Sequence, residues 1–175
     1  MAEKQSAAGK PGGNGEAAAD PSKSPQLRIL NQYVKDLSFE NPNAPAALTG
    51  TPDAPKIEAS VDVQAKKHSD SDYEVLLKIT VSAKRAEAVS FITELIYGGL
   101  FRLQNIPEEQ KQPVILIECP RQLFPFARRV IADTIRDGGY PPLLLDPIDF
   151  LALYQQQMKS RGGQAAKPTA APSVE

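Results

Sequence analysis

Hydrophobic residues at every second position predict β-strands in the first half of the chain. Over residues 27–40 the odd positions, Tyr33 and Phe39 among them, are mainly apolar, and the even positions are mainly polar. This is the pattern of a half-buried strand. Leu30 and Val34 add apolar area at even positions, so we expect both faces of this strand to be partly covered.

Two further segments alternate more regularly and are joined by a short polar stretch. Residues 57–66 place Ile, Ala and Val on one face and Glu, Ser, Asp, Gln and Lys on the other, and residues 73–83 repeat the pattern. Between them, His68 to Asp72 read HSDSD, and short Ser and Asp side chains favour turns. The sequence therefore predicts a hairpin of two strands.

A fourth strand is predicted over residues 89–97, with a mixed second face that includes Ile92 and Glu94. A helix is the alternative there, because Ala and Glu favour helices. We expect Gly98 and Gly99 to end the strand and a loop to follow. The apolar run 113–119 then favours a helix that is broken at Pro120.

After Pro120 the apolar residues no longer recur at every second position but at the three- to four-residue spacing of a helix. Ala127, Val130, Ile131, Thr134 and Ile135 share one helical stripe, and charged residues occupy the opposite side. Glycines at 138 and 139 followed by prolines at 141 and 142 end this helix. A second helix is predicted from 146 to 158 because an aspartate that can cap precedes Pro147.

These elements predict an α+β fold: a four-stranded antiparallel sheet followed by two main helices that pack on one face. Residues 41–55 contain four prolines and should form a long crossing loop. Residues 1–25 and 159–175 are poor in large apolar side chains, so both are expected to be disordered tails. Residues 26–158 would then be a single domain.

Composition excludes several classes of function. Acidic side chains slightly outnumber basic ones, with a net charge of −1, so a nucleic-acid partner is not expected. Neither a signal peptide nor an apolar run long enough to insert into a membrane is present, which predicts a cytoplasmic protein. A single cysteine, Cys119, and a single histidine, His68, supply neither an internal disulfide nor a metal site, and no cofactor is expected.

Few residues suggest catalysis. Cys119 follows an apolar run and is best interpreted as a buried residue, and His68 lies in a polar turn. Asp146 and Asp149 could act as an acid and base, but helix capping explains both. No phosphate-binding glycine motif occurs. A binding protein is therefore favoured; a small α+β enzyme that uses Asp146, Asp149 or Cys119 and a general interaction protein are the alternatives.

Three stretches resemble the SecB family of protein-export chaperones. They are DLSFENPNAP at 36–45, YGGLFRL at 97–103 and the long segment CPRQLFPFARRVIADTIRDGGYPPLLLDPIDFLALY at 119–154. The resemblance implies an ATP-independent holdase that binds unfolded precursor proteins, keeps them competent for translocation and delivers them to the ATPase SecA. It also implies a cytoplasmic homotetramer built as a dimer of dimers.

The resemblance also implies functional residues. By motif position, a SecA-binding surface falls on Asp36, Glu40, Ile92 and Glu94, where acidic groups would attract a short basic, zinc-holding tail of SecA. The zinc would belong to that partner.

Client binding and assembly are expected along the helical end of the chain. Apolar grooves between the second helix, the crossing loop and the sheet would hold clients, and their candidate lining residues are Phe39, Tyr140, Leu143, Phe150, Leu153 and Tyr154. The first long helix would pack between dimers, with candidate interface residues Ala127, Val130, Ile131 and Thr134.

Overall fold

The computed structural model describes residues 24–49, 54–86 and 88–164. Its elements, in chain order, are β1 (Gln26–Glu40), α1 (Ala46–Thr49), β2 (Lys56–Lys67), β3 (Asp72–Arg85), β4 (Ala88–Gln104), α2 (Glu108–Pro113), the π-helical turn η2 (Val114–Glu118), α3 (Cys119–Asp137) and α4 (Phe150–Gln164). The predicted tails lie largely outside the described residues. The predicted domain bounds stay a prediction, and α4 continues to Gln164, beyond the predicted end of the second helix at 158.

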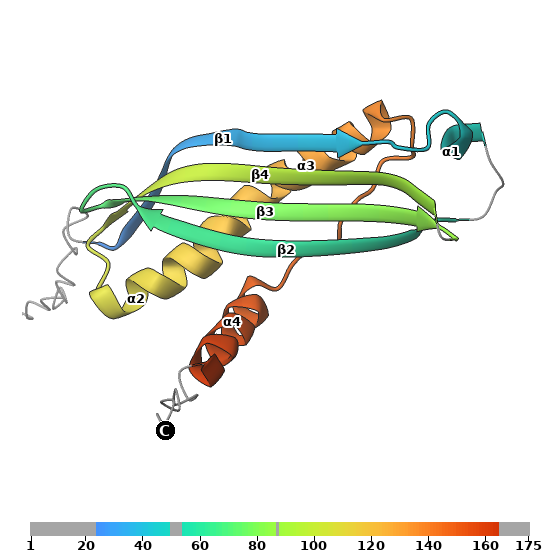
Figure 1. Cartoon of the computed structure of the whole chain (residues 1–175). Helices are drawn as coiled ribbons and strands as arrows, with labels where there is room; N and C mark the ends of the chain where they lie inside the picture. Colours follow the sequence, from blue (N-terminus) through green and yellow to red (C-terminus); the bar gives the residue numbers. More distant parts are fainter. Residues whose placement is uncertain (1–23, 50–53, 87, 165–175) are drawn as a thin grey trace, which may run out of the picture.

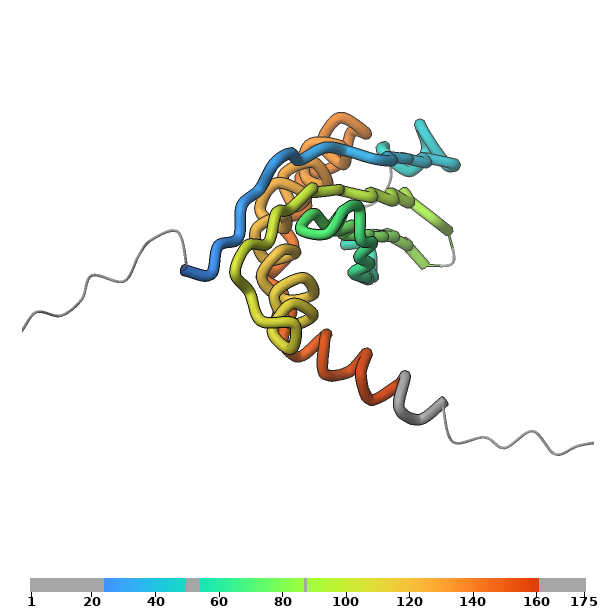
Figure 2. The backbone as a smooth tube through the Cα atoms, turned by 90° about the vertical axis from the view of Figure 1, so that its left-hand side faces the viewer, coloured from blue at the N-terminus to red at the C-terminus, as the bar shows by residue number. Residues whose placement is uncertain are grey.

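The four strands form one antiparallel sheet in the order β1-β4-β3-β2, which confirms the predicted α+β architecture. Figure 1 shows α3 running along one face of this sheet, and Figure 2 shows the same two layers from the side. We call the face toward α3 the inner face and the opposite face the outer face. The alternative of a helix over residues 89–97 is wrong.

Strand β1 does not keep the simple alternation that its sequence predicts. Its pairing with β4 slips between Ile29 and Asn31 and again between Val34 and Asp36. Each bulge inserts one residue and reverses which face the next side chain meets. Tyr33 therefore lies on the outer face, where its ring covers Gly98, rather than on the same face as Phe39 as predicted.

The paired glycines in β4 do not end the strand, contrary to the prediction. A side chain at Gly98 would overlap the ring of Tyr33, and one at Gly99 would collide with Phe101 and Leu123. Both glycines thus allow close packing on opposite faces of a continuous strand. The two glycines therefore permit close contacts with neighbouring side chains and do not end β4.

The helical run after β4 is continuous through Pro120, so the predicted break there is wrong. Pro120 stands in the first turn of α3, directly after η2, and Glu118 and Cys119 both keep right-handed helical backbone angles. A proline is tolerated in the first turn of a helix because its missing N–H has no partner to lose there. Because π-helical geometry changes to α-helical geometry at this point, α3 begins here and Pro120 lies in its first turn.

The core lies between α3 and the two central strands. On β3 and β4 the inner-face positions are buried almost without exception, and the apolar stripe of α3 covers them. On β2 only Val63 is buried, although its whole alternating face was predicted to be core. The inner face of β2 is therefore uncovered by α3 within one chain.

Helix α3 ends as predicted, whereas α4 starts later than predicted. The N–H of Gly138 donates to the carbonyl of Thr134, and Gly139 follows with a φ of 91°, the left-handed region that favours glycine. The carboxylate of Asp149, not that of Asp146, accepts a hydrogen bond from the N–H of Ala152 at 3.0 Å. Asp149 is thus the capping residue, and α4 begins at Phe150.

Candidate functional site

The four residues predicted for the acidic surface come together on the outer face of the sheet. Glu40 pairs with Ile92 across β1 and β4, and Glu94 pairs with Ser38, two residues from Asp36. Because directly opposed residues of an antiparallel pair share a face, all four side chains leave the sheet on the same side. We call Asp36, Glu40, Ile92 and Glu94 the acidic face.

The acidic face is accessible and only partly neutralised. Asp36 and Glu40 are exposed, and Ile92 and Glu94 are half-buried. Lys78 on β3 approaches Glu94 with 3.4 Å between Nζ and Oε2. An exposed ion pair of this length contributes little to stability, so Glu94 can exchange Lys78 for another cation.

A polar cluster lies farther along the same face. Glu74 accepts hydrogen bonds from Tyr33 Oη at 2.6 Å and from Lys35 Nζ at 2.7 Å, and these contacts lower its pKa. Burial, helped by the bond to Glu74, raises the pKa of Tyr33 to about 12. The Tyr33 hydroxyl thus stays protonated as a donor, and its ring stays fixed over Gly98.

A cleft of about 600 Å³ opens on the inner side of β2. Its walls come from β2, from Tyr73 on β3, from α2 and η2, and from Gln157 on α4. Val63, Ala65, Ile115 and Leu116 give it an apolar lining. We call it the β2 cleft. The sequence did not identify these residues, because the alternation on β2 is that of an ordinary half-buried strand.

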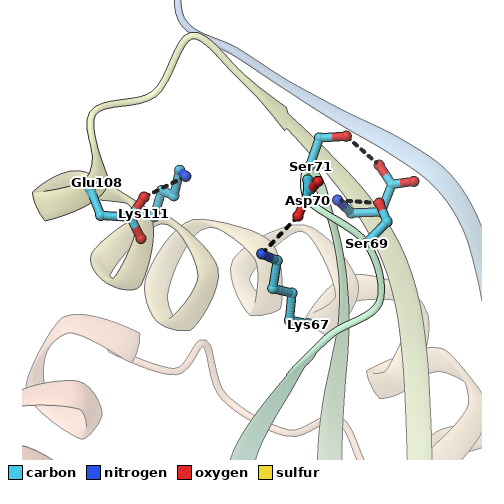
Figure 3. Close-up of polar contacts among 7 residues, drawn as sticks. Lys67, Ser69, Asp70, Ser71, Glu108 and Lys111 are labelled. Carbon is cyan, nitrogen blue, oxygen red and sulfur yellow. Dashed lines mark hydrogen bonds and ion pairs between the residues drawn. The ribbon is translucent and has the colours of Figure 1, made fainter.

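Charged side chains frame one end of the β2 cleft, as Figure 3 shows. Lys67 pairs with Asp70 at 3.1 Å on the β2–β3 hairpin, and Lys111 pairs with Glu108 at 2.6 Å on α2. Both lysines and Glu108 line the cleft. The lining of the cleft thus combines apolar side chains with charged and amide side chains.

The predicted groove residues divide between core and partly covered positions. Phe150 is 1% exposed and meets Phe124 edge to face at 6.1 Å, which places it in the core of this chain, and its role in a client groove stays a prediction. Tyr140, at 9% exposed, packs against Phe91. The remaining candidates, which are half-buried, are Phe39, Leu143, Leu153 and Tyr154. Their contact with clients stays a prediction.

The predicted assembly residues on α3 also divide. Ala127 and Ile131 are 0% exposed because they pack against the chain's own sheet, so within one chain they belong to the core, and their role at an interface stays a prediction. Val130 and Thr134 are half-buried, and their role stays a prediction. The exposed side of α3 instead carries Phe126.

Residues considered for catalysis lie in unsuitable surroundings. Cys119 is fully buried, and burial raises the pKa of its thiol to about 12, so the nucleophilic thiolate is not formed. Asp149 caps α4, and Asp146 and His68 are exposed. Among the described residues no cluster of His, Cys, Asp and Glu could hold a metal ion.

Within the described parts of the chain, every helix is too short or too polar to cross a bilayer.

Comparison with known proteins gives concordant results. The family model for SecB, preprotein translocase subunit SecB, matches residues 20–161. The chain is 53% identical to the protein-export protein SecB of Parvibaculum lavamentivorans over 159 residues, which cover 90% of this chain and 95% of the relative. It is also 53% identical to SecB of Maricaulis maris over 144 residues, 82% of this chain and 84% of the relative.

A solved structure has the same fold. A SecB-like chaperone of Mycobacterium tuberculosis, in complex with a ChAD peptide from the HigA1 antitoxin, superposes with a TM-score of 0.53 at 16% identity, covering 70% of this chain and 87% of that one. The matching family model, the high identity along most of the chain and the shared fold agree: this chain belongs to the SecB family of protein-export chaperones.

Proposed function

We propose that this chain is an ATP-independent holdase that captures unfolded precursor proteins on apolar surface and hands them to SecA. Membership of the SecB family supports a chaperone role in protein export. The observation that carries the finer proposal is the amount of apolar surface left uncovered in one folded chain. Its exposed large side chains are Ile29, Leu30, Val34, Leu37, Leu48, Ile57, Phe126, Leu144, Leu151 and Met158.

Part of this apolar surface is grouped on single elements, and a contiguous exposed apolar patch is typical of a surface that binds a partner. The residues on β1 gather at one edge of the sheet, and those on α4 lie beyond the opposite edge, past β2. We assign the β1 edge and the exposed side of α3 to contacts between copies in a homotetramer. The β2 cleft, together with α4 and the half-buried candidates Phe39, Leu143, Leu153 and Tyr154, is assigned to clients.

Capture in this arrangement needs no nucleotide. A precursor segment that binds the β2 cleft weakly gains affinity when other segments of the same chain bind equivalent clefts on other copies. A folded protein buries such segments and escapes. Binding only the unfolded client lowers the concentration of free unfolded chain, and mass action then holds back folding. The peptide in the complex of the mycobacterial SecB-like chaperone supports peptide capture by this fold.

The direct test is the refolding of a chemically unfolded export precursor, followed by its intrinsic fluorescence. Stoichiometric amounts of the tetramer should slow refolding without added nucleotide, and a mature domain that has already folded should be unaffected. A refolding rate that is unchanged at every ratio of chaperone to client would refute holdase activity.

Assembly is tested separately by size-exclusion chromatography with light scattering. A tetramer is expected at micromolar concentration. Phe126→Asp places a charge on the exposed side of α3 and should shift the mass toward a dimer, whereas Gln110→Asp, which places the same charge at an exposed position of α2, serves as its control. A monomeric wild-type chain would contradict the assignment of the β1 edge.

We assign the acidic face to SecA. Exposed carboxylates attract a basic segment through a Coulomb attraction that salt screens, and Ile92 adds apolar contact. Glu40→Ala and Glu94→Gln should each weaken binding of the carboxyl-terminal tail of SecA several-fold while leaving client capture intact. Glu109→Gln on α2 is the matched control because it removes an exposed charge that lies outside the sheet. Equal affinities for all four proteins in a titration would contradict the assignment.

A further inference from the structure

The exposed side of α3 carries a regular stripe of residues that the sheet does not cover. The stripe consists of Gln122, Phe126, Arg129, Asp133 and Arg136, which follow one another in steps of four and three residues. This is the spacing with which one helix packs along another. Phe126 is 46% exposed, and the two arginines are exposed as well. The described parts of the chain therefore leave most of the stripe open to another molecule.

A hollow of about 400 Å³ lies on this side of α3. Four of its lining residues have the spacing i, i+3, i+4 and i+7: Arg129, Ala132, Asp133 and Arg136. In packed helices, residues at this spacing form the hole that receives one side chain of the facing helix. Ala132 is the most buried of the four and contributes only a methyl group, and Leu144 lines the hollow from the α3–α4 connection. The hollow thus has room for a large apolar side chain.

The polar groups around the hollow are incompletely partnered. Asp133 pairs with Arg136 at 3.2 Å, whereas Arg129 has no ion-pair partner among the described residues. The Nε of Arg128, which also lines the hollow, is buried and finds no hydrogen-bond acceptor in the same part of the chain. Because buried donors are almost always bonded, this one indicates that the hollow is completed by a group from another molecule.

We propose that Phe126 of one copy inserts into this hollow on α3 of a second copy, which returns the same contact with its own Phe126. The inference rests on the proposed contacts between copies along α3 and adds the site that receives Phe126. Each α3 then both gives a phenylalanine and receives one. Such a reciprocal contact is the form that an interface between identical subunits takes about a two-fold axis.

The positions of Phe126 and the hollow along α3 fit a two-fold axis between antiparallel helices. Phe126 precedes the centre of the four-residue hole by six to seven residues, which is about 10 Å along a helix. A two-fold axis midway between them brings each phenylalanine onto the hole of the other copy. Arg129 then lies near the axis, within reach of Asp133 of the second copy. The arginine without an ion-pair partner among the described residues of its own chain thus meets a carboxylate, which favours a second copy as the occupant.

Substitutions on either side of the contact should weaken the tetramer. Burial of a phenylalanine strengthens an association by roughly ten- to hundred-fold. Since a reciprocal contact counts it twice, Phe126→Ala should raise the dissociation constant of the tetramer into dimers by at least about a hundred-fold. Leu144→Asp should act in the same direction, because it places a charge in the hollow while Phe126 stays intact.

Mass photometry over a range of protein concentrations measures this dissociation. Leu144 is 66% exposed, so its substitution leaves the fold of the chain intact, and circular dichroism checks this. Leu151→Asp is the matched control, since it makes the same change at an exposed leucine of α4 that does not line the hollow. It should dissociate at the wild-type concentration.

Mixing two variants tests whether the phenylalanine and the hollow meet between copies. Phe126→Ala keeps an intact hollow, and Leu144→Asp keeps an intact phenylalanine. Either variant alone loses both reciprocal contacts, whereas a mixed pair regains one of the two. An equimolar mixture should therefore form tetramers at concentrations where each variant alone is a dimer. Native mass spectrometry, with a mass tag on one variant, should find both variants in these tetramers.

The possible results separate this contact from the proposed function. A tetrameric Phe126→Ala protein, a tetrameric Leu144→Asp protein, or a mixture without mixed tetramers would overturn the exchange of phenylalanines and leave the proposed homotetramer in place. A wild-type chain that forms no tetramer would overturn both. The refolding assay on the same proteins decides holdase activity independently of their mass.

Discussion

Replacing Phe150 by alanine tests whether this side chain belongs to the core, as its surroundings indicate, or to a groove. Phe150 opens α4, is 1% exposed and meets Phe124 edge to face. Complete burial of a phenylalanine contributes about 1.5 to 3 kcal/mol. The aromatic pair adds about 0.5 to 1.5 kcal/mol. We therefore expect Phe150→Ala to lower the free energy of unfolding by about 3 kcal/mol or slightly more, within the usual range for such truncations.

The assay is urea denaturation followed by circular dichroism at one fixed protein concentration, because the stability of an oligomer depends on concentration. Leu151→Ala is the matched control, since Leu151 is the next residue of α4 and is exposed. It should change stability by about 0.5 kcal/mol at most. Equal losses for the two variants, or a Phe150→Ala protein of wild-type stability that binds clients more weakly, would refute the placement of Phe150 in the core.

Three further predictions concern the sheet. Gly98→Val should strongly destabilise the protein in the same assay, because the new side chain would overlap the tyrosine ring that covers this position. Lys78→Gln should tighten binding of the SecA tail several-fold at low salt, because Glu94 loses the cation beside it, and the gain should vanish at high salt. The hydrogen bonds from Arg102 lower the pKa of Asp72 to about 2, so this pair contributes stability above pH 3.8 that is lost as the pH falls toward about 2. The stability difference between the wild type and Asp72→Asn should shrink over that window, and a difference independent of pH would contradict the linkage.

The sequence predicted the strands and α3 well because their periods are visible along the chain. The alternation on β3 has no interruption, and its inner face is buried as predicted. The acidic face was also predictable in part, because strand parity places Asp36 with Glu40 and Ile92 with Glu94. All four residues share one face because of the register between β1 and β4. The sequence pattern of either strand does not determine this register.

Burial by the chain's own sheet and burial by another molecule have the same sequence pattern. Ile131 and Phe150 are apolar residues at helical spacing, and that spacing is equally compatible with core, interface and groove. Only the packing of α3 on the sheet and of Phe150 on Phe124 distinguishes these environments. The β2 cleft was missed for a related reason, since an alternating strand gives no sign of whether a helix covers its apolar face.

The two bulges of β1 have a consequence for how this strand can change over evolution. Each inserts one residue, and together they cancel, so Leu27 and Phe39 share the inner face while the segment between the bulges is reversed. A single deletion at the second bulge would remove its extra residue and leave Asp36 opposite Ile96, so Phe39 would stay on the inner face and Asp36 and Glu40 on the outer face. A deletion in the regular stretch after the second bulge would instead move the later residues to the opposite face. Single-residue deletions in β1 are therefore tolerable at its bulges but not in its regularly paired stretches.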